Sequence, residues 1–306
     1  MSLDEPRTNF LFWNIQKKFV TQNLVRLVES HDIHVLMLAE TAFKDTPFED
    51  NATRLAEALN DGPKPSDSSA FSVVTGSSTS RIQIFSRLKH PQWTRLATHD
   101  YYDIWSFASD AEELLYLAAV HFPSVQVDQG DGQRTVAMEL RGDLQTLRTG
   151  ESDSWKETYI VACGDFNASP FDPGICGIYG LNASLSREIV QRSGGKRTLH
   201  KRDYPYLYNP MWRLSAGVET GSTGTGSAKI YGTYYNSGLS KSVDPFWYTL
   251  DQVLISSSLL SSFRDNEMHV AVRDAENGGV SFVSRDGLPS SKVYSDHLPI
   301  FFSVRL

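Results

Sequence analysis

The stretch "VACGDFNASP", residues 161–170, joins a short apolar run to a cluster of polar residues. Small and apolar residues lead into Gly164, and Asp165 and Asn167 follow at once. One interpretation is an ordinary turn, because Gly, Asp and Asn favour turns. The other is that the end of a buried strand holds a carboxylate and a carboxamide beside a reacting group. The rest of the sequence has to decide between them.

Strand and helix patterns alternate along the chain. Apolar runs predict buried strands over 10–14 and 33–40, and apolar residues at helical spacing predict a helix over 19–30 between them. This order suggests a right-handed crossover unit in an α/β sheet. A second amphipathic helix is predicted around 136–147. The other strand-like runs are "FSVVTG", "RIQIFSR", "WTRLAT", "IWSFAS", "LLYLAAVHF", "TYIVACGDFN", "WYTLDQVLIS" and "LPIFFSVRL".

Composition is that of a soluble globular protein. The chain has 306 residues, of which 40% are hydrophobic and 21% are charged. No apolar run approaches the roughly 18 to 20 residues that cross a bilayer, and the N-terminus does not resemble a secretory signal. Two cysteines are too few for a disulfide framework or a cysteine zinc site, so we expect a cytoplasmic protein without a membrane partner. The net charge of −7 argues against wholesale electrostatic binding of nucleic acid, but it allows a local basic groove.

Polar residues recur where apolar runs begin or end. In open α/β sheets, ligands gather outside one end of the strands. Carboxylates and histidines that meet there would form a site for a hard cation with proton-transfer groups attached. Each residue alone has a plain structural explanation, and only their joint recurrence favours a site. They are Asn14, Glu40, His121, Asp165, Asn167, Asp251, Asp296 and His297.

Six short motifs resemble those of the endonuclease/exonuclease/phosphatase superfamily. They are "WNI" (13–15), "LAET" (38–41), "VHFPS" (120–124), "GDFN" (164–167), "LDQVLIS" (250–256) and "SDHLPI" (295–300). They occur in the family's order, so the resemblance covers essentially the whole chain. It implies a deoxyribonuclease I-like α/β fold, a four-layer α/β/β/α sandwich with two packed mixed β-sheets. It also implies a single domain over 1–306, with loop insertions at about 41–69 and 170–247.

The resemblance also implies roles at the matching positions. Glu40, with Asn14 and Asp296, would hold Mg²⁺, for which Mn²⁺ could substitute. Asp165 would orient or deprotonate the attacking water, with Asn167 hydrogen-bonding beside it.

Two histidines complete the implied site. His297, paired with Asp251, would stabilise the pentavalent phosphorus transition state, and His121 would contact a phosphate oxygen. The chemistry is consistent, since hydrolysis of an anionic phosphodiester needs its charge neutralised and a nucleophile held in line.

Substrate choice depends on the region between "GDFN" and Asp251. Residues 187–202 carry six Lys and Arg side chains against one acid, and aromatic residues follow them. Cations with aromatics suit a nucleic acid backbone with stacked bases, but a solvated loop with aromatic anchors remains an open alternative. The candidate substrate contacts are Arg192, Lys196, Arg197, Tyr234 and Trp247.

Three functions follow as hypotheses. The first is a Mg²⁺-dependent phosphodiesterase, a nuclease acting on DNA or RNA. His121 stands where abasic-site endonucleases carry a tyrosine, which counts against abasic-site repair. The second is a phosphatase acting on a small molecule such as an inositol phosphate or nucleotide. The third is a catalytically inactive binding scaffold.

Overall fold

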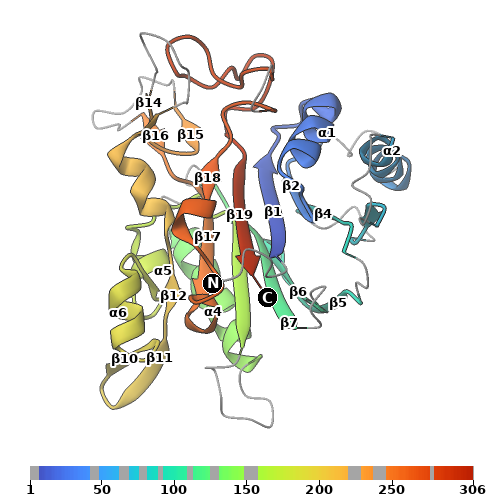
Figure 1. The fold of residues 1–306 in the computed structure, drawn as a ribbon. Helices are drawn as coiled ribbons and strands as arrows, with labels where there is room; N and C mark the ends of the chain where they lie inside the picture. The colour runs from blue at the N-terminus through green and yellow to red at the C-terminus, as the bar shows by residue number, and fades with distance from the viewer. Residues whose placement is uncertain are drawn as a thin grey trace.

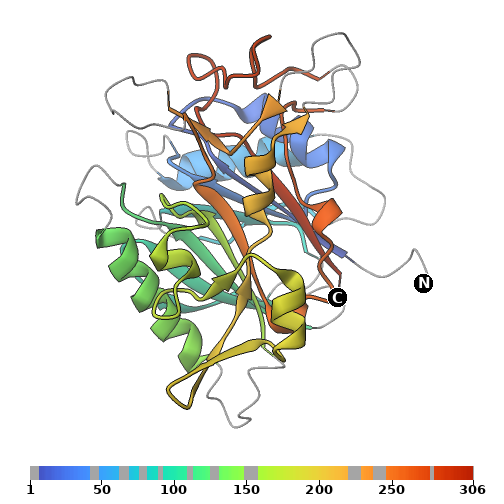
Figure 2. The same ribbon diagram turned by 90° about the vertical axis from the view of Figure 1, so that its left-hand side faces the viewer.

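Two mixed β-sheets pack face to face, and helices cover their outer surfaces (Figure 1, Figure 2). This arrangement is the four-layer sandwich predicted from the sequence. The computed structural model describes residues 7–41, 48–61, 69–75, 81–88, 92–108, 113–124, 131–147, 158–219, 229–236, 246–275 and 279–305. Within these residues, no helix is both long and apolar enough to cross a lipid bilayer.

The first sheet has six strands in the order β18-β19-β1-β2-β4-β3. Strand β1 pairs in parallel with β2 and antiparallel with β19. The parallel pair is joined through α1, as the strand–helix–strand pattern predicted. The strands are β1 (Arg7–Asn14), β2 (Val35–Ala39), β3 (Ser72–Val73), β4 (Ile82–Ser86), β18 (His269–Val270) and β19 (Ile300–Arg305). Helices α1 (Thr21–Ser30) and α2 (Phe48–Asn60) lie on its outer side (Figure 1).

The second sheet has seven strands in the order β5-β6-β7-β8-β17-β12-β9. Its strands are β5 (Thr94–Thr98), β6 (Tyr102–Ala108), β7 (Leu114–His121), β8 (Tyr159–Asp165), β9 (Ala183–Ser184), β12 (Leu207–Tyr208) and β17 (Asp251–Ser256). Strands β7 and β8 are parallel, whereas β17 runs antiparallel to β8. Helix α4 (Asp131–Thr146) packs on the outer face of this sheet.

Within the stretch 170–247, the described residues 170–219 and 229–236 are more ordered than their sequence suggested. Strands β9 and β12 lie within it and extend the second sheet at one edge. Two-residue strands are too short to produce a recognisable apolar alternation. The other elements here are α5 (Pro173–Cys176), α6 (Arg187–Arg192), β10 (Lys196–Leu199), β11 (Arg202–Pro205), η2 (Met211–Ala216), β13 (Val218–Glu219), β14 (Lys229–Ile230) and β15 (Tyr234–Tyr235). Strand β16 (Trp247–Tyr248) begins at the last residue of this stretch, and η3 (Ser257–Leu259) and η4 (Asp265–Glu267) lie beyond it.

Aromatic side chains fill the space between the sheets. Phe10 of β1 stacks on Phe302 of β19, with ring centroids 4.8 Å apart. It also meets Phe107, on β6 of the other sheet, at 6.4 Å. All three side chains are buried. Along the strands of the second sheet, successive side chains point alternately into this interior and toward the face under α4. Because a shift of one residue would exchange the two faces, this alternation fixes the register of the strands.

Candidate active site

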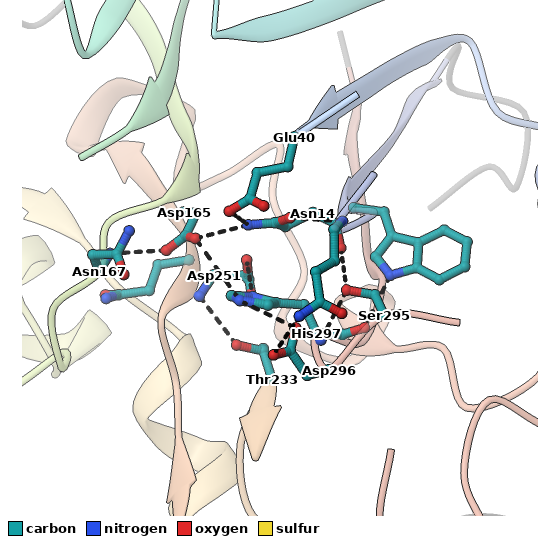
Figure 3. A network of polar contacts seen from close by, with 12 residues as sticks. Asn14, Glu40, Asp165, Asn167, Thr233, Asp251, Ser295, Asp296 and His297 are labelled. Carbon is teal, nitrogen blue, oxygen red and sulfur yellow. Dashed lines mark hydrogen bonds and ion pairs between the residues drawn. The ribbon is translucent and has the colours of Figure 1, made fainter. Parts of the chain in front are cut away.

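The polar residues predicted from strand ends converge at one end of both sheets (Figure 3). Asn14 ends β1 and Glu40 directly follows β2 in the first sheet. In the second sheet, Asp165 ends β8 and is aligned with His121 of β7 on one side and Asp251 of β17 on the other. Strand pairing therefore brings together residues that are distant in sequence.

The "GDFN" stretch forms a tight backbone arrangement that fixes Asp165. Gly164 has a φ of 149°, and a Cβ there would lie 1.9 Å from the Val120 carbonyl oxygen, so only glycine fits. The Asn167 backbone N–H donates to Asp165 Oδ1 at 2.9 Å. The Asn167 side chain donates to the Phe122 carbonyl oxygen at 3.0 Å. The stretch is thus both a turn and a support that orients a carboxylate.

Asn14 links the two sheets within the site. Its Nδ2 donates to Asp165 Oδ2 at 3.1 Å and to Glu40 Oε1 at 3.3 Å. Its Oδ1 accepts the Gln16 backbone N–H at 3.1 Å, and Gln16 Nε2 donates to Asp296 Oδ2 at 3.0 Å. The three predicted metal-holding residues are therefore connected through Asn14 and Gln16.

His297 and Asp251 form a buried ion pair. His297 Nδ1 lies 2.8 Å from Asp251 Oδ2, and the Asp251 residue is fully buried. Burial alone lowers the pKa of His297, but the carboxylate of Asp251, aided by those of Asp165 and Asp296, raises it to about 10. Burial raises the pKa of Asp251, and the His297 imidazolium counteracts that increase. The Asp251 carboxylate thus favours the protonated form of His297.

Backbone contacts hold this histidine in place. The His297 carbonyl oxygen accepts the Trp13 indole N–H at 2.9 Å. Ser295 Oγ accepts the His297 backbone N–H and donates to the Asn14 carbonyl oxygen, at 3.1 and 2.6 Å. Thr233 Oγ1 accepts the Asp251 backbone N–H at 3.0 Å.

Both histidines face the carboxylates of the site. His297 Nε2 lies 4.0 Å from Asp165 Oδ2 and 4.0 Å from Asp296 Oδ1. His121 Nε2 lies 3.8 Å from Glu40 Oε1 and 4.0 Å from Asp165 Oδ2. Burial raises the pKa of Asp296, and the neighbouring Glu40 and Asp165 carboxylates add to that effect. The crowded carboxylates would be stabilised by a cation.

The donor set fits a divalent metal ion. Asp165, Asp251 and His297 each offer a ligand atom, and these atoms lie within 4.8 Å of one another. Asp251 and His297 are, however, hydrogen-bonded to each other. Glu40 and Asp296 carry further carboxylate oxygens, the type of ligand that a hard cation such as Mg²⁺ prefers.

The predicted substrate contacts divide into two groups. The Tyr234 ring lies 4.7 Å from the His297 ring, and Trp247 is paired with Tyr235 in the same β15–β16 hairpin. Arg192, Lys196 and Arg197 lie on α6 and β10, and the structure does not bring them to the site.

Strand geometry gives the distance between the site and β12, the strand that follows the β10–β11 hairpin. After hairpin β10–β11, Leu207 of β12 pairs with Ser256, five residues along β17 from Asp251. At about 3.3 Å per residue this is roughly 17 Å from the site. Figures 1 and 2 both show hairpins β10–β11 and β15–β16 at opposite ends of the molecule. Lys196 forms an ion pair with Asp203 of its own hairpin.

Two residues of the site were not predicted from the sequence. Gln16 contacts Asp296 across 280 positions, and Thr233 supports Asp251 from an irregular segment. Neither lies at the end of an apolar run, so the pattern of strand ends could not identify them.

The fold is similar to those of several solved structures, although the sequence identity is low. No family model and no curated protein matches the sequence. The structure is similar to D. rerio TDP2 complexed with a single-strand DNA product, with a TM-score of 0.51 and 13% identity over 98% of this chain and 99% of that one.

Two further structures are similar across the whole chain. An AP endonuclease from Archaeoglobus fulgidus gives a TM-score of 0.50 at 11% identity, over 98% of this chain and 100% of that one. An endonuclease/exonuclease/phosphatase family protein from Leptotrichia buccalis gives 0.50 at 14% identity, with the same coverage. The chain therefore has the fold of the endonuclease/exonuclease/phosphatase superfamily, as its motifs predicted.

Proposed function

We propose that the protein is a divalent-metal-dependent phosphodiesterase that cleaves nucleic acid by attack of water on phosphorus. The observation that carries this proposal is the His297–Asp251 ion pair. The other ring nitrogen of His297, Nε2, lies 4.0 Å from Asp165 Oδ2 within a cluster of carboxylates. A buried cation beside a fixed carboxylate supplies what phosphodiester hydrolysis needs: charge stabilisation and a base.

Glu40 and Asp296, with Asn14, would hold the metal ion, which is Mg²⁺ or in its place Mn²⁺. When bound, the ion would neutralise charge on the phosphate oxygens. Gln16 would hold the Asp296 carboxylate in position through its hydrogen bond of 3.0 Å.

Asp165 is suited to act as the general base. The Asn167 N–H holds its Oδ1 and Asn14 Nδ2 holds its Oδ2, so the carboxylate cannot rotate freely. A carboxylate fixed in this way can orient a water molecule and accept its proton.

The histidines would stabilise charge on the phosphate. His297 keeps its proton at neutral pH because Asp251 holds its Nδ1 side, so its Nε2–H would donate to a phosphate oxygen. His121 would contact a phosphate oxygen from the side of Glu40.

Nucleic acid is the substrate class that the comparisons favour. The D. rerio TDP2 structure contains a single-strand DNA product, and the Archaeoglobus fulgidus protein is an AP endonuclease. Tyr234, whose ring lies beside that of His297, would contact a base at the site, and Trp247 lies in the same β15–β16 hairpin.

One observation favours the second candidate, a phosphatase acting on a small molecule. The basic residues Arg192, Lys196 and Arg197 lie far from the site, so they cannot contact the phosphate at the reaction centre. A small substrate would need no such extended basic surface.

A substrate panel separates the candidates. The protein is incubated with Mg²⁺ or Mn²⁺ and plasmid DNA, single-stranded RNA, inositol phosphates or nucleotides, with Asp165→Asn as the control for contaminating activity. Nucleic acid cleavage by the wild type alone supports the proposal. Phosphate release without such cleavage supports the second candidate. Inactivity on every substrate contradicts both and favours a binding scaffold.

A further inference from the structure

The turn between β1 and α1, residues 16–20 and here called the β1–α1 turn, has an unusual backbone. Gln16 has a φ of 47° and Lys17 a φ of 58°, a region that residues other than Gly, Asn and Asp rarely adopt. Such conformations persist only where surrounding contacts impose them, and they concentrate at functional sites.

The candidate active site itself imposes this conformation. The Lys17 backbone N–H donates to the Glu40 carbonyl oxygen at 2.7 Å. Gln16 is held by Asn14 at its backbone and by Asp296 at its side chain. The Lys18 backbone N–H closes the turn on the Ile15 carbonyl oxygen at 2.8 Å. The turn is thus fixed to the proposed metal-holding residues, while the side chains of Lys17 and Phe19 are exposed to solvent.

The turn displays an aromatic ring to solvent. Phe19 is 95% exposed, the largest value among the large hydrophobic residues that the structure describes. The adjacent Val20 is buried and anchors the chain. An apolar ring held in water beside a catalytic centre gains free energy when a flat ligand covers it.

The turn also carries two lysine side chains. Lys17 is exposed, and Lys18 is next to it. Helix α1 begins directly after the turn, with no side-chain capping bond at Val20 and no acidic residue in its first turn. Its N-terminus therefore keeps its partial positive charge.

The acid that contacts α1 does not cancel this charge. Asp274 is fully buried and is engaged by Asn23, Arg26 and the Val280 N–H. In a chain with a net charge of −7, the two lysines and the helix terminus therefore place positive charge at this turn.

We propose that the β1–α1 turn docks a single-stranded nucleic acid next to the reacting phosphate. Lys17, Lys18 and the N-terminus of α1 bind a neighbouring backbone phosphate, and Phe19 stacks on an unpaired base. This inference rests on the proposed nuclease function. It adds that the protein binds a phosphate and an unpaired base of the strand next to the phosphate that reacts. These residues position the substrate and do not touch the reacting atoms.

Three variants and two substrates test this proposal. The substrates are a labelled single-stranded DNA oligonucleotide and bis(p-nitrophenyl) phosphate, a diester too small to reach the turn. Phe19→Ala should raise the KM for the oligonucleotide about tenfold, the effect of losing one stacked base, while kcat changes little. Phe19→Trp should restore the KM. Lys17→Ala/Lys18→Ala should reduce the magnitude of the slope of log(kcat/KM) against log[salt] by about 0.7, the value for one phosphate contact on a single strand.

The matched control is Lys201→Ala/Arg202→Ala, which removes the same charge from exposed positions on the β10–β11 hairpin. Comparison with this control separates the loss of the two turn lysines from the general effect of lowering the net charge on KM and on the salt slope. Thermal unfolding of every variant checks that the fold is intact.

The outcomes are distinguishable. If the wild type cleaves the oligonucleotide and the turn variants keep its KM and salt slope, the docking role is wrong while the proposed function stands. If the wild type hydrolyses only the small diester, both the nucleic acid substrate and the docking role are wrong. If it hydrolyses neither, the proposed function fails and the inference fails with it.

Discussion

Replacing Asp251 by Asn tests the electrostatic basis of the site. The substitution keeps the shape of the side chain but removes the charge that lies 2.8 Å from His297 Nδ1. Without that carboxylate, burial dominates and lowers the pKa of His297. The histidine should therefore lose its proton near neutral pH, and with it the ability to donate a charged hydrogen bond to a phosphate oxygen.

The magnitude follows from the pKa values. The pKa of His297 is about 10 in the folded protein, and that of an ordinary histidine is 6.5. At about 1.36 kcal/mol per pKa unit, this difference corresponds to about 5 kcal/mol of stability. This is an upper limit, and breaking a buried ion pair by removing one partner costs about 3 to 5 kcal/mol. Because the folded-state pKa is the higher one, the stabilisation is complete below pH 6.5 and is lost as the pH rises through about 10.

The assay is urea unfolding of wild type and Asp251→Asn in EDTA at several pH values, with NMR titration of the histidine rings. Asp100→Asn, at an exposed carboxylate outside the site, is the control. We expect a stability difference of about 3 to 5 kcal/mol at pH 6 that diminishes toward pH 10. A difference that stays constant over this range, or a wild-type His297 that titrates near 6.5, would refute the reasoning.

Further predictions concern the residues proposed to hold the metal ion and the backbone at Gly164. Gln16→Leu should weaken activation by Mg²⁺ about 10- to 100-fold, because Asp296 loses its partner, and an Mg²⁺ titration of activity measures this. An unchanged titration would exclude the positioning role. Gly164→Ala should destabilise the protein by about 3 kcal/mol, since its Cβ would meet the Val120 carbonyl oxygen at 1.9 Å, whereas Gly142→Ala has open space and should not destabilise. Equal unfolding midpoints for the two variants would contradict this. Mg²⁺ at about 100 times its Kd should stabilise the wild type by about 2.7 kcal/mol, detectable by thermal unfolding, and Asp296→Asn should reduce that gain.

The fold could be predicted where the sequence pattern is long or repeated. The helix expected over 19–30 is α1 (Thr21–Ser30), and the one expected around 136–147 is the later part of α4 (Asp131–Thr146). The ordered motifs implied two packed sheets, which the structure confirms. Each of these patterns recurs over many residues, so local ambiguity averages out.

Parts of the site depend on contacts that no local pattern encodes. Asn14 and Asp165 meet across two sheets, and their proximity could be expected because both end strands. Gln16 reaches Asp296 only through the strained β1–α1 turn, and no strand end marks it. The cations of residues 187–202 would approach the site only if β12 paired with the end of β17 that holds Asp251. It pairs with the other end, and this feature of sheet topology has no local sequence pattern.

The most direct test of the central claim is hydrolysis of bis(p-nitrophenyl) phosphate by wild type and Asp165→Asn as Mg²⁺ is titrated from an EDTA-treated sample. The variant keeps the volume of a side chain that is 1% exposed, so it should fold like the wild type. We predict turnover that depends on Mg²⁺ in the wild type and falls by about 10²- to 10⁴-fold in Asp165→Asn, the contribution of a general base. Turnover that persists in EDTA, or a variant as active as the wild type, would contradict the assignment of this site.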